Sequence, residues 1–165
     1  MSGSPGGSAH PSGTRGGREV VVTRILPVSA AAAWDLLLEG RNHERWIPLT
    51  RIDLPDGPLR LGARFEATSG PFARRGAPGL LDRMRLDRFS PPTADRPGEA
   101  LFTKLGPVLL GDSTVRVADA GPGRARVTWS ERVVLAGPVP AGPVLAPVLG
   151  LMLRLALLRI ARELR

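Results

Sequence analysis

The sequence predicts an α+β fold in which a curved antiparallel β-sheet wraps around one long C-terminal helix. Three observations support this prediction. A single strand-like run, Glu19 to Leu26, comes first and is followed by two short helical stretches. A series of short strand-like runs separated by Gly/Pro turns comes next. The chain closes with a leucine-rich helix from Ala141 to Arg165, and a helix that is apolar nearly all round needs a concave sheet to bury it.

The first strand and first helix have clear local signals. The run Glu19 to Leu26 is rich in β-branched residues and stops before Pro27, which is typical of a strand. Ser29 can cap a helix whose body, Ala30 to Leu38, consists of strong helix formers and ends before Gly40. We therefore expect a strand, a tight turn and a short helix in that order.

A second short helix and a meander of strands should follow. Asn42 can cap this helix, which should end at Trp46 because Pro48 follows shortly after. Gly/Pro-rich segments then separate runs with the alternation of half-buried strands. The expected strands are Arg51 to Leu54, Gly62 to Thr68, Leu80 to Phe89, Glu99 to Leu105, Ser113 to Asp119 and Arg124 to Leu135.

The C-terminal helix should follow a linker from Gly137 to Pro143 and pack on the sheet through one apolar stripe. The stripe has helical spacing and comprises Leu149, Leu153, Ala156, Leu157, Ile160 and Leu164. Arginines cluster on the opposite side of this helix. A membrane span is not expected, because Pro143 and Pro147 interrupt its start and Arg154 and Arg159 interrupt the rest. An interfacial helix on a membrane surface is the more serious alternative.

The composition excludes several kinds of partner and site. The net charge is +8, but the arginines are scattered and Lys104 is the only lysine, so we expect a solvated arginine-rich surface and no nucleic-acid partner. The chain has no cysteine, which excludes disulfides and thiolate sites and favours the cytoplasm. Residues 1–18 are mostly Gly, Ser and Pro and should form a disordered tail, leaving a single domain over residues 19–165.

Several local motifs in this order resemble one superfamily. They are the Val28-Ser-Ala-Ala-Ala-Ala-Trp34 segment after the first strand, Trp46 at the end of the second helix, Gly62-Ala-Arg-Phe65 and Val127-Thr-Trp-Ser-Glu131. Over Glu19 to Arg165 the chain resembles the START/Bet v 1-like (SRPBCC) superfamily, within it the polyketide cyclase/dehydrase and lipid-transport branch. The resemblance implies a helix-grip fold with a hydrophobic ligand cavity between sheet and helix. It implies no particular reaction, since the superfamily mixes carriers, receptors, cyclases and hydrolases.

Two carboxylates are candidates for a catalytic role. Glu131 shares a strand face with Val127, Trp129 and Val133, and Asp82 shares one with apolar residues of its own strand. A carboxylate in an apolar cavity should have a raised pKa and can act as general acid or base. The alternative is structural, with Glu131 near a strand end and paired to an arginine such as Arg83 or Arg116.

Large apolar side chains are the candidates for ligand contact. Such side chains belong to the core more often than to a ligand site, because large aromatics dominate ordinary cores. The candidate ligand-binding residues are Trp34, Trp46, Phe65, Met84, Phe102, Trp129, Leu149 and Leu153.

No metal site and no cofactor are expected. His10 lies in the tail, and His43 stands beside Glu44 and Arg45 without the cluster of ligands that a metal needs. A Ser/His/Asp triad would have His43 as its only base, and the glycine-rich segments contain proline and do not open helices as phosphate loops do.

Three functions follow as hypotheses. The first is binding of a small hydrophobic molecule, such as a lipid, polyketide or isoprenoid, with Glu131 or Asp82 orienting its polar end. The second is a cyclase or dehydratase on the same scaffold, in which Glu131 removes a proton next to a carbonyl. The third is a protein that binds an anionic membrane surface or an acidic partner through the arginines of the last helix. The oligomeric state has no signal in the sequence.

Overall fold

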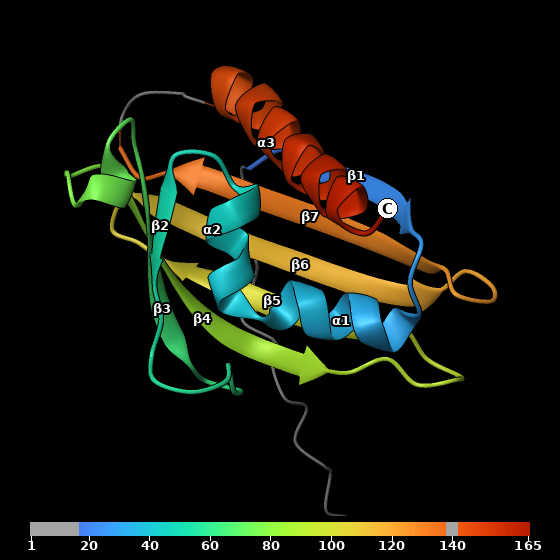
Figure 1. The fold of residues 1–165 in the computed structure, drawn as a ribbon. Helices are drawn as coiled ribbons and strands as arrows, with labels where there is room; N and C mark the ends of the chain where they lie inside the picture. Colours follow the sequence, from blue (N-terminus) through green and yellow to red (C-terminus); the bar gives the residue numbers. More distant parts are fainter. Residues whose placement is uncertain (1–16, 138–141) are drawn as a thin grey trace, which may run out of the picture.

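The computed structural model describes residues 17–137 and 142–165. Most of the expected tail, residues 1–16, and the expected start of the last helix at Ala141 lie outside these residues. Within them, an antiparallel sheet carries three α-helices on one side, as Figure 1 shows. The predicted α+β helix-grip fold is confirmed.

The sheet has seven strands in the order β1-β7-β6-β5-β4-β3-β2. All neighbouring strands are antiparallel. The first strand of the chain pairs with the last, and it lies at the opposite edge of the sheet from the second strand. The strands are β1 (Glu19–Leu26), β2 (Thr50–Asp53), β3 (Arg64–Ser69), β4 (Leu80–Ser90), β5 (Gly98–Leu105), β6 (Leu109–Asp119) and β7 (Ala125–Leu135).

The segment between β1 and β2 crosses the concave face of the sheet. It consists of α1 (Ala30–Leu38), the 3-10 turn η1 (Gly40–Asn42) and α2 (His43–Trp46). The Ser29 hydroxyl caps α1 as expected, accepting a hydrogen bond from the Ala32 amide at 3.2 Å. This crossing connects the two edges of the sheet and covers one end of the concave face (Figure 1).

Two local expectations were wrong. The Asn42 side chain does not cap the second helix; its amide donates instead to the Leu36 carbonyl at 3.0 Å, and Asn42 itself belongs to the 3-10 turn. The last helix, α3 (Gly142–Glu163), is not interrupted by its prolines, and Pro147 lies inside it. Pro147 lies within the first two turns, where its missing N–H removes only one early backbone hydrogen bond.

Helix α3 packs on the sheet through the predicted stripe. Leu153, Leu157 and Ile160 are at most 1% exposed, and the helix contacts β1, β7 and α2. By length and composition alone, α3 is the one helix within the described residues that is apolar enough to cross a membrane. In this structure it is the helix that the sheet grips, and its Val144 and Leu151 are exposed.

Gly111 occupies a position in β6 that only glycine suits. Its φ is +128°, and a Cβ atom there would lie 1.9 Å from the carbonyl oxygen of Arg132 on β7. The two strands therefore approach closely at this point, and any side chain would force them apart.

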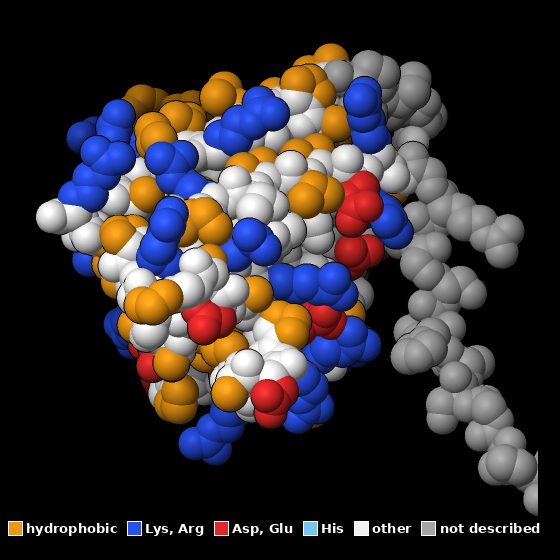
Figure 2. Space-filling view, turned by 90° about the vertical axis from the view of Figure 1, so that its right-hand side faces the viewer, with side chains coloured by type: hydrophobic (Ala, Val, Ile, Leu, Met, Phe, Trp, Pro, Cys, Tyr) orange, Lys and Arg blue, Asp and Glu red, His pale blue; other side chains and the backbone are white. Residues whose placement is uncertain are grey.

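On at least one face of the molecule the positive charge is dispersed. On the face shown in Figure 2, Lys and Arg side chains are dispersed among apolar and uncharged ones, with acidic side chains between some of them. Such a distribution differs from the continuous basic stripe of a nucleic-acid interface.

Candidate functional site

A cavity of about 240 Å³ lies between the concave face of the sheet, α2 and the N-terminal half of α3. Inward-facing positions of the strands and one face of α3 supply its walls, which are predominantly apolar. The lining comprises Gly40, His43, Ile47, Thr50, Ile52, Leu54, Leu59, Phe65, Ala67, Ser69, Leu80, Asp82, Met84, Phe102, Lys104, Leu109, Ser113, Trp129, Glu131, Val133, Leu145, Val148, Leu149, Met152 and Leu153.

Most of the residues singled out from the sequence meet at this cavity. Both carboxylates, Asp82 and Glu131, line it. So do the apolar candidates Phe65, Met84, Phe102, Trp129, Leu149 and Leu153. They come from four strands and α3, so the fold gathers positions that are far apart in the sequence.

Trp34 and Trp46 lie elsewhere and are core residues. Trp34 packs against Phe89, with ring centroids 5.4 Å apart. Trp46 is fully buried, and its indole nitrogen donates to Oε2 of Glu163 at 3.0 Å, which ties α2 to the end of α3. Both belong to the buried core cluster, and neither is among the residues that line this cavity.

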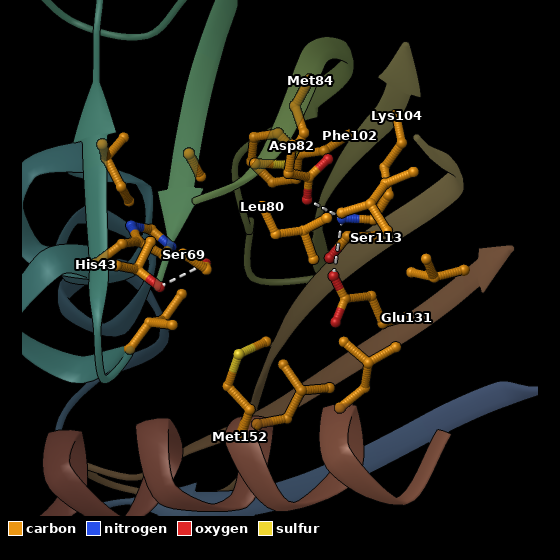
Figure 3. A pocket seen from close by; sticks show the side chains of 18 of the residues that line it. His43, Ser69, Leu80, Asp82, Met84, Phe102, Lys104, Ser113, Glu131 and Met152 are labelled. Carbon is orange, nitrogen blue, oxygen red and sulfur yellow. Dashed lines mark hydrogen bonds and ion pairs between the residues drawn. The ribbon is translucent and has the colours of Figure 1, made fainter. Parts of the chain in front are cut away.

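The polar feature of the cavity is a buried lysine between two carboxylates. The Lys104 ammonium donates to Oδ2 of Asp82 and lies 3.1 Å from Oε1 of Glu131. The three side chains are only 2%, 14% and 8% exposed, in the order Lys104, Asp82, Glu131. Figure 3 shows them with Ser113 on one wall, with His43 and Ser69 on the other side of the cavity and Met152 of α3 below.

The structural alternative for Glu131, an arginine partner, was wrong. Arg83 pairs with Glu66 at 2.9 Å, and Arg116 pairs with Glu99 at 2.6 Å, both on the outer face of the sheet. Because side chains alternate along a strand, these arginines point away from the cavity. The partner that the sequence analysis missed is Lys104, whose inward position follows from its alternation with the buried Ala100 and Phe102.

Each carboxylate keeps one oxygen unused. Oδ1 of Asp82 and Oε2 of Glu131 are buried, and neither has a hydrogen-bond partner among residues 17–137 and 142–165. Buried acceptors without partners are rare in proteins, because each one loses the hydrogen bonds that water would make. The two free oxygens belong to residues that line the cavity.

Burial and ion pairing both shift the pKa values of Asp82 and Lys104. Burial raises the pKa of Asp82, and the attraction of Lys104 only partly offsets this. Burial alone would lower the pKa of Lys104, but Glu131 and Asp82 outweigh it and the pKa of Lys104 lies above its ordinary value. The lysine therefore stays charged, and Asp82 takes up a proton more readily than an exposed aspartate does.

His43 is a second polar residue of the cavity that the sequence analysis left without a role. Burial lowers its pKa, so the imidazole is neutral at neutral pH. Its ring meets that of Trp129 edge to face, with centroids 5.6 Å apart. The Trp129 indole in turn donates to the Ser113 hydroxyl at 3.0 Å. A lone histidine at the start of a short helix gave no sequence signal of this position.

This arrangement suits binding or proton transfer. The apolar walls can hold a hydrophobic body, and the free carboxylate oxygens can accept hydrogen bonds or a proton from its polar end. Within the part of the chain that the structure describes, no group of three or more His, Asp or Glu side chains is placed to hold a metal ion.

Solved structures share this fold at low sequence identity. No protein-family model and no curated protein matches the sequence. A hypothetical protein from Helicobacter pylori superposes with a TM-score of 0.67 at 15% identity, covering 90% of this chain and 88% of its own. A START superfamily protein from Mycobacterium smegmatis gives 0.63 at 15% identity, covering 89% and 99%.

A third similar structure is the di-domain ARO/CYC BexL from the BE-7585A biosynthetic pathway. It superposes with a TM-score of 0.62 at 18% identity over 88% of this chain. The match covers 45% of that protein, so the chain spans about half of its length. At these identities the similarity establishes the fold, and the role of the cavity has to be argued from its own residues.

Proposed function

We propose that this chain, which has the START-like helix-grip fold, binds a small hydrophobic molecule in the cavity between its sheet and α3. The observation that carries the proposal is the combination of an apolar cavity with one polar cluster, Asp82, Lys104 and Glu131, on a single wall. Ligand sites commonly pair apolar walls with a few polar groups that fix orientation. The START superfamily protein and BexL with the same fold support this class of function.

The cavity volume limits the size of the ligand. A cavity of 150 Å³ holds benzene, so the 240 Å³ found here has room for about ten non-hydrogen atoms within its walls. A lipid, polyketide or isoprenoid of that size fits inside, and a longer one would have to extend past the rim. Val148 on α3, which lines the cavity yet is 57% exposed, marks where the cavity meets solvent.

Titration with 1-octanol tests the proposal with a neutral ligand of matching size. Calorimetry gives the stoichiometry, and tryptophan fluorescence provides a second readout because Trp129 lines the cavity. The variant Ala67→Phe places a large ring in the cavity, and Ala118→Phe is the matched control on the outer face of β6. We expect binding at one site, at least about tenfold weaker in Ala67→Phe and unchanged in the control.

The proposal fails if the wild type does not bind octanol, or if Ala67→Phe binds it as tightly as the control does. Circular dichroism and thermal unfolding of both variants distinguish a blocked cavity from an unfolded chain.

A cyclase or dehydratase is the second candidate function. The free oxygens of Asp82 and Glu131 favour it, since a buried carboxylate beside a bound carbonyl compound can act as a general base. The resemblance to BexL adds support at the level of the fold. Exchange of the α-hydrogens of 2-octanone in D₂O, followed by NMR, tests this chemistry without knowledge of the natural substrate.

For an enzyme, wild type should accelerate this exchange, while Glu131→Gln should bind the ketone with similar affinity and exchange no faster than buffer. A carrier should show the buffer rate with both proteins, which would leave ligand binding as the function. The proposal places either function in the cytoplasm, on the basis of a chain without cysteine.

A further inference from the structure

We infer that the polar end of the ligand is an amine, held as an ammonium ion between the free oxygens of Asp82 and Glu131. The inference rests on the proposed function and specifies its ligand class. Three observations carry it: the charge of the cluster, the kind of hydrogen-bonding group left unpaired, and the absence of other charges on the described walls.

The charge of the cluster is unbalanced. One ammonium group, Lys104, faces two carboxylates, so the fully ionised cluster carries a net charge of −1. Burying an uncompensated charge in an apolar cavity is costly, because few dipoles replace the lost water. A cationic ligand would neutralise that charge, whereas an anionic ligand would add to it.

The free groups are both acceptors. Oδ1 of Asp82 and Oε2 of Glu131 have no partner in the described part of the chain, and ionised carboxylate oxygens can only accept hydrogen bonds. A primary ammonium group carries three donors and can satisfy both oxygens at once. A hydroxyl group has one donor and would leave one of the two unpaired.

No other described group on the cavity wall competes for the cation or repels it. The α3 side of the lining is entirely apolar, from Leu145 to Leu153. The β2 and β3 side contributes the uncharged Thr50 and Ser69, which hydrogen-bond to each other at 2.8 Å. His43 of α2 faces the cavity as a neutral imidazole at neutral pH.

When no amine is bound, a proton can neutralise the negative charge of the cluster instead. Because burial raises the pKa of Asp82, the empty cavity can take up one proton and become neutral. An ammonium ion that enters must displace this proton, so amine binding releases a proton and tightens as pH rises through the titration of Asp82. Lys104 stays protonated over this range, and His43 becomes neutral as pH rises, which removes a competing positive charge.

Three ligands with the same eight-carbon body test the inference by calorimetry at pH 7: octylamine, 1-octanol and octanoate. We expect octylamine to bind at least about tenfold more tightly than octanol, as hydrogen bonds to charged groups predict, and octanoate to bind most weakly. Repeated below pH 7 in phosphate and in HEPES, buffers with different heats of ionisation, the titrations should show proton release with octylamine that grows as the pH is lowered through the titration of Asp82, and none with octanol.

Charge-removing variants locate the amine. Glu131→Gln makes the ionised cluster neutral and should reduce the preference for octylamine over octanol to less than about threefold. Asp82→Asn should do the same and also abolish the proton release, so it serves if Glu131→Gln does not fold. Glu66→Gln, which removes a carboxylate of similar charge from the outer face of the sheet, is the matched control and should leave the preference unchanged.

Different results would overturn the amine and the proposed binding function. If octanol binds as tightly as octylamine, or if octanoate binds best, the amine is wrong and ligand binding stands. If the preference for octylamine survives both charge-removing variants, the amine binds elsewhere and the inference is overturned. If none of the three ligands binds, the proposed function fails and the inference fails with it.

Discussion

The Lys104 ammonium lies 3.1 Å from Oε1 of Glu131 in an interior that is otherwise apolar, and the same ammonium also donates to Asp82. Lys104 is the only lysine in the chain. Its ammonium group pairs with both buried carboxylates, which would otherwise lie in the cavity without a positive charge to balance them. We therefore expect the stability of the fold to depend on this one side chain.

Replacing Lys104 with methionine should strongly destabilise the protein at neutral pH. The change keeps most of the side-chain volume but leaves two buried carboxylates without a cation, which costs about 3–5 kcal/mol when a buried pair loses one partner. Urea denaturation measures the loss. The matched control is Arg83→Met, whose exposed pair with Glu66 is worth less than about 1 kcal/mol. Equal losses in the two variants would contradict a special role for Lys104.

His43 should make the protein less stable in mild acid. Because burial lowers the pKa of His43 in the folded state, the unfolded chain binds a proton first as pH falls below about 6.5. The free energy of unfolding should therefore fall as the pH is lowered from neutral through the titration of the unfolded-state histidine. His43→Gln should lack this fall.

Asp82 should change the free energy of unfolding with pH in the direction opposite to His43. Its raised pKa means that the folded state holds a proton that the unfolded chain has lost, so this contribution to stability decreases as pH rises. The difference in unfolding free energy between wild type and His43→Gln, measured at each pH, separates the two. A difference that is constant from pH 5 to pH 7.5 would rule out the histidine effect.

Gly111→Ala should destabilise the sheet by at least about 2 kcal/mol, because a positive φ and a clash with the Arg132 carbonyl act together. Gly121→Ala is the control with a positive φ of +104° and nothing within 4 Å of the added Cβ, and it should lose only about 1 kcal/mol. Thermal unfolding of the two variants gives the comparison. Equal losses would mean that β6 and β7 can separate at Gly111 without cost.

Deleting residues 1–16 should leave stability within about 1 kcal/mol of wild type, since their composition offers little apolar surface to bury. Chemical denaturation of the truncated chain makes the measurement. A larger loss would show that the Gly/Ser/Pro-rich segment belongs to the folded domain.

Local sequence patterns predicted the bounds of the first strand and helix and the inward faces of two later strands. The β-branched run of β1 and the helix formers of α1 gave bounds that agree with the structure, Glu19–Leu26 and Ala30–Leu38. Alternation along β4 and β7 correctly turned Asp82 and Glu131 inward, because the period of a strand fixes its faces. These are properties of short segments that the rest of the chain does not change.

The contacts between segments needed the three-dimensional structure. Lys104 meets its partners because β5 pairs with β4 across a register shift at Leu86 and Arg88, and no local pattern specifies that register. His43 reaches the cavity only because α2 follows a 3-10 turn and lies near α3. The aromatic candidates show the same limit, since size alone could not separate the cavity residue Trp129 from the core residue Trp46.

The pairing of the first strand with the last affects how the protein is made. Val22 of β1 pairs with Trp129 of β7, so about a hundred residues must be synthesised before this edge of the sheet can close. At about 5–20 residues per second, the valine-rich segment waits roughly 5 to 20 s on the ribosome without its partner. During that interval it is an unpaired apolar strand, open to chaperones and to other nascent chains. A message cut short before β7 would yield a chain in which β1 has no place to fold.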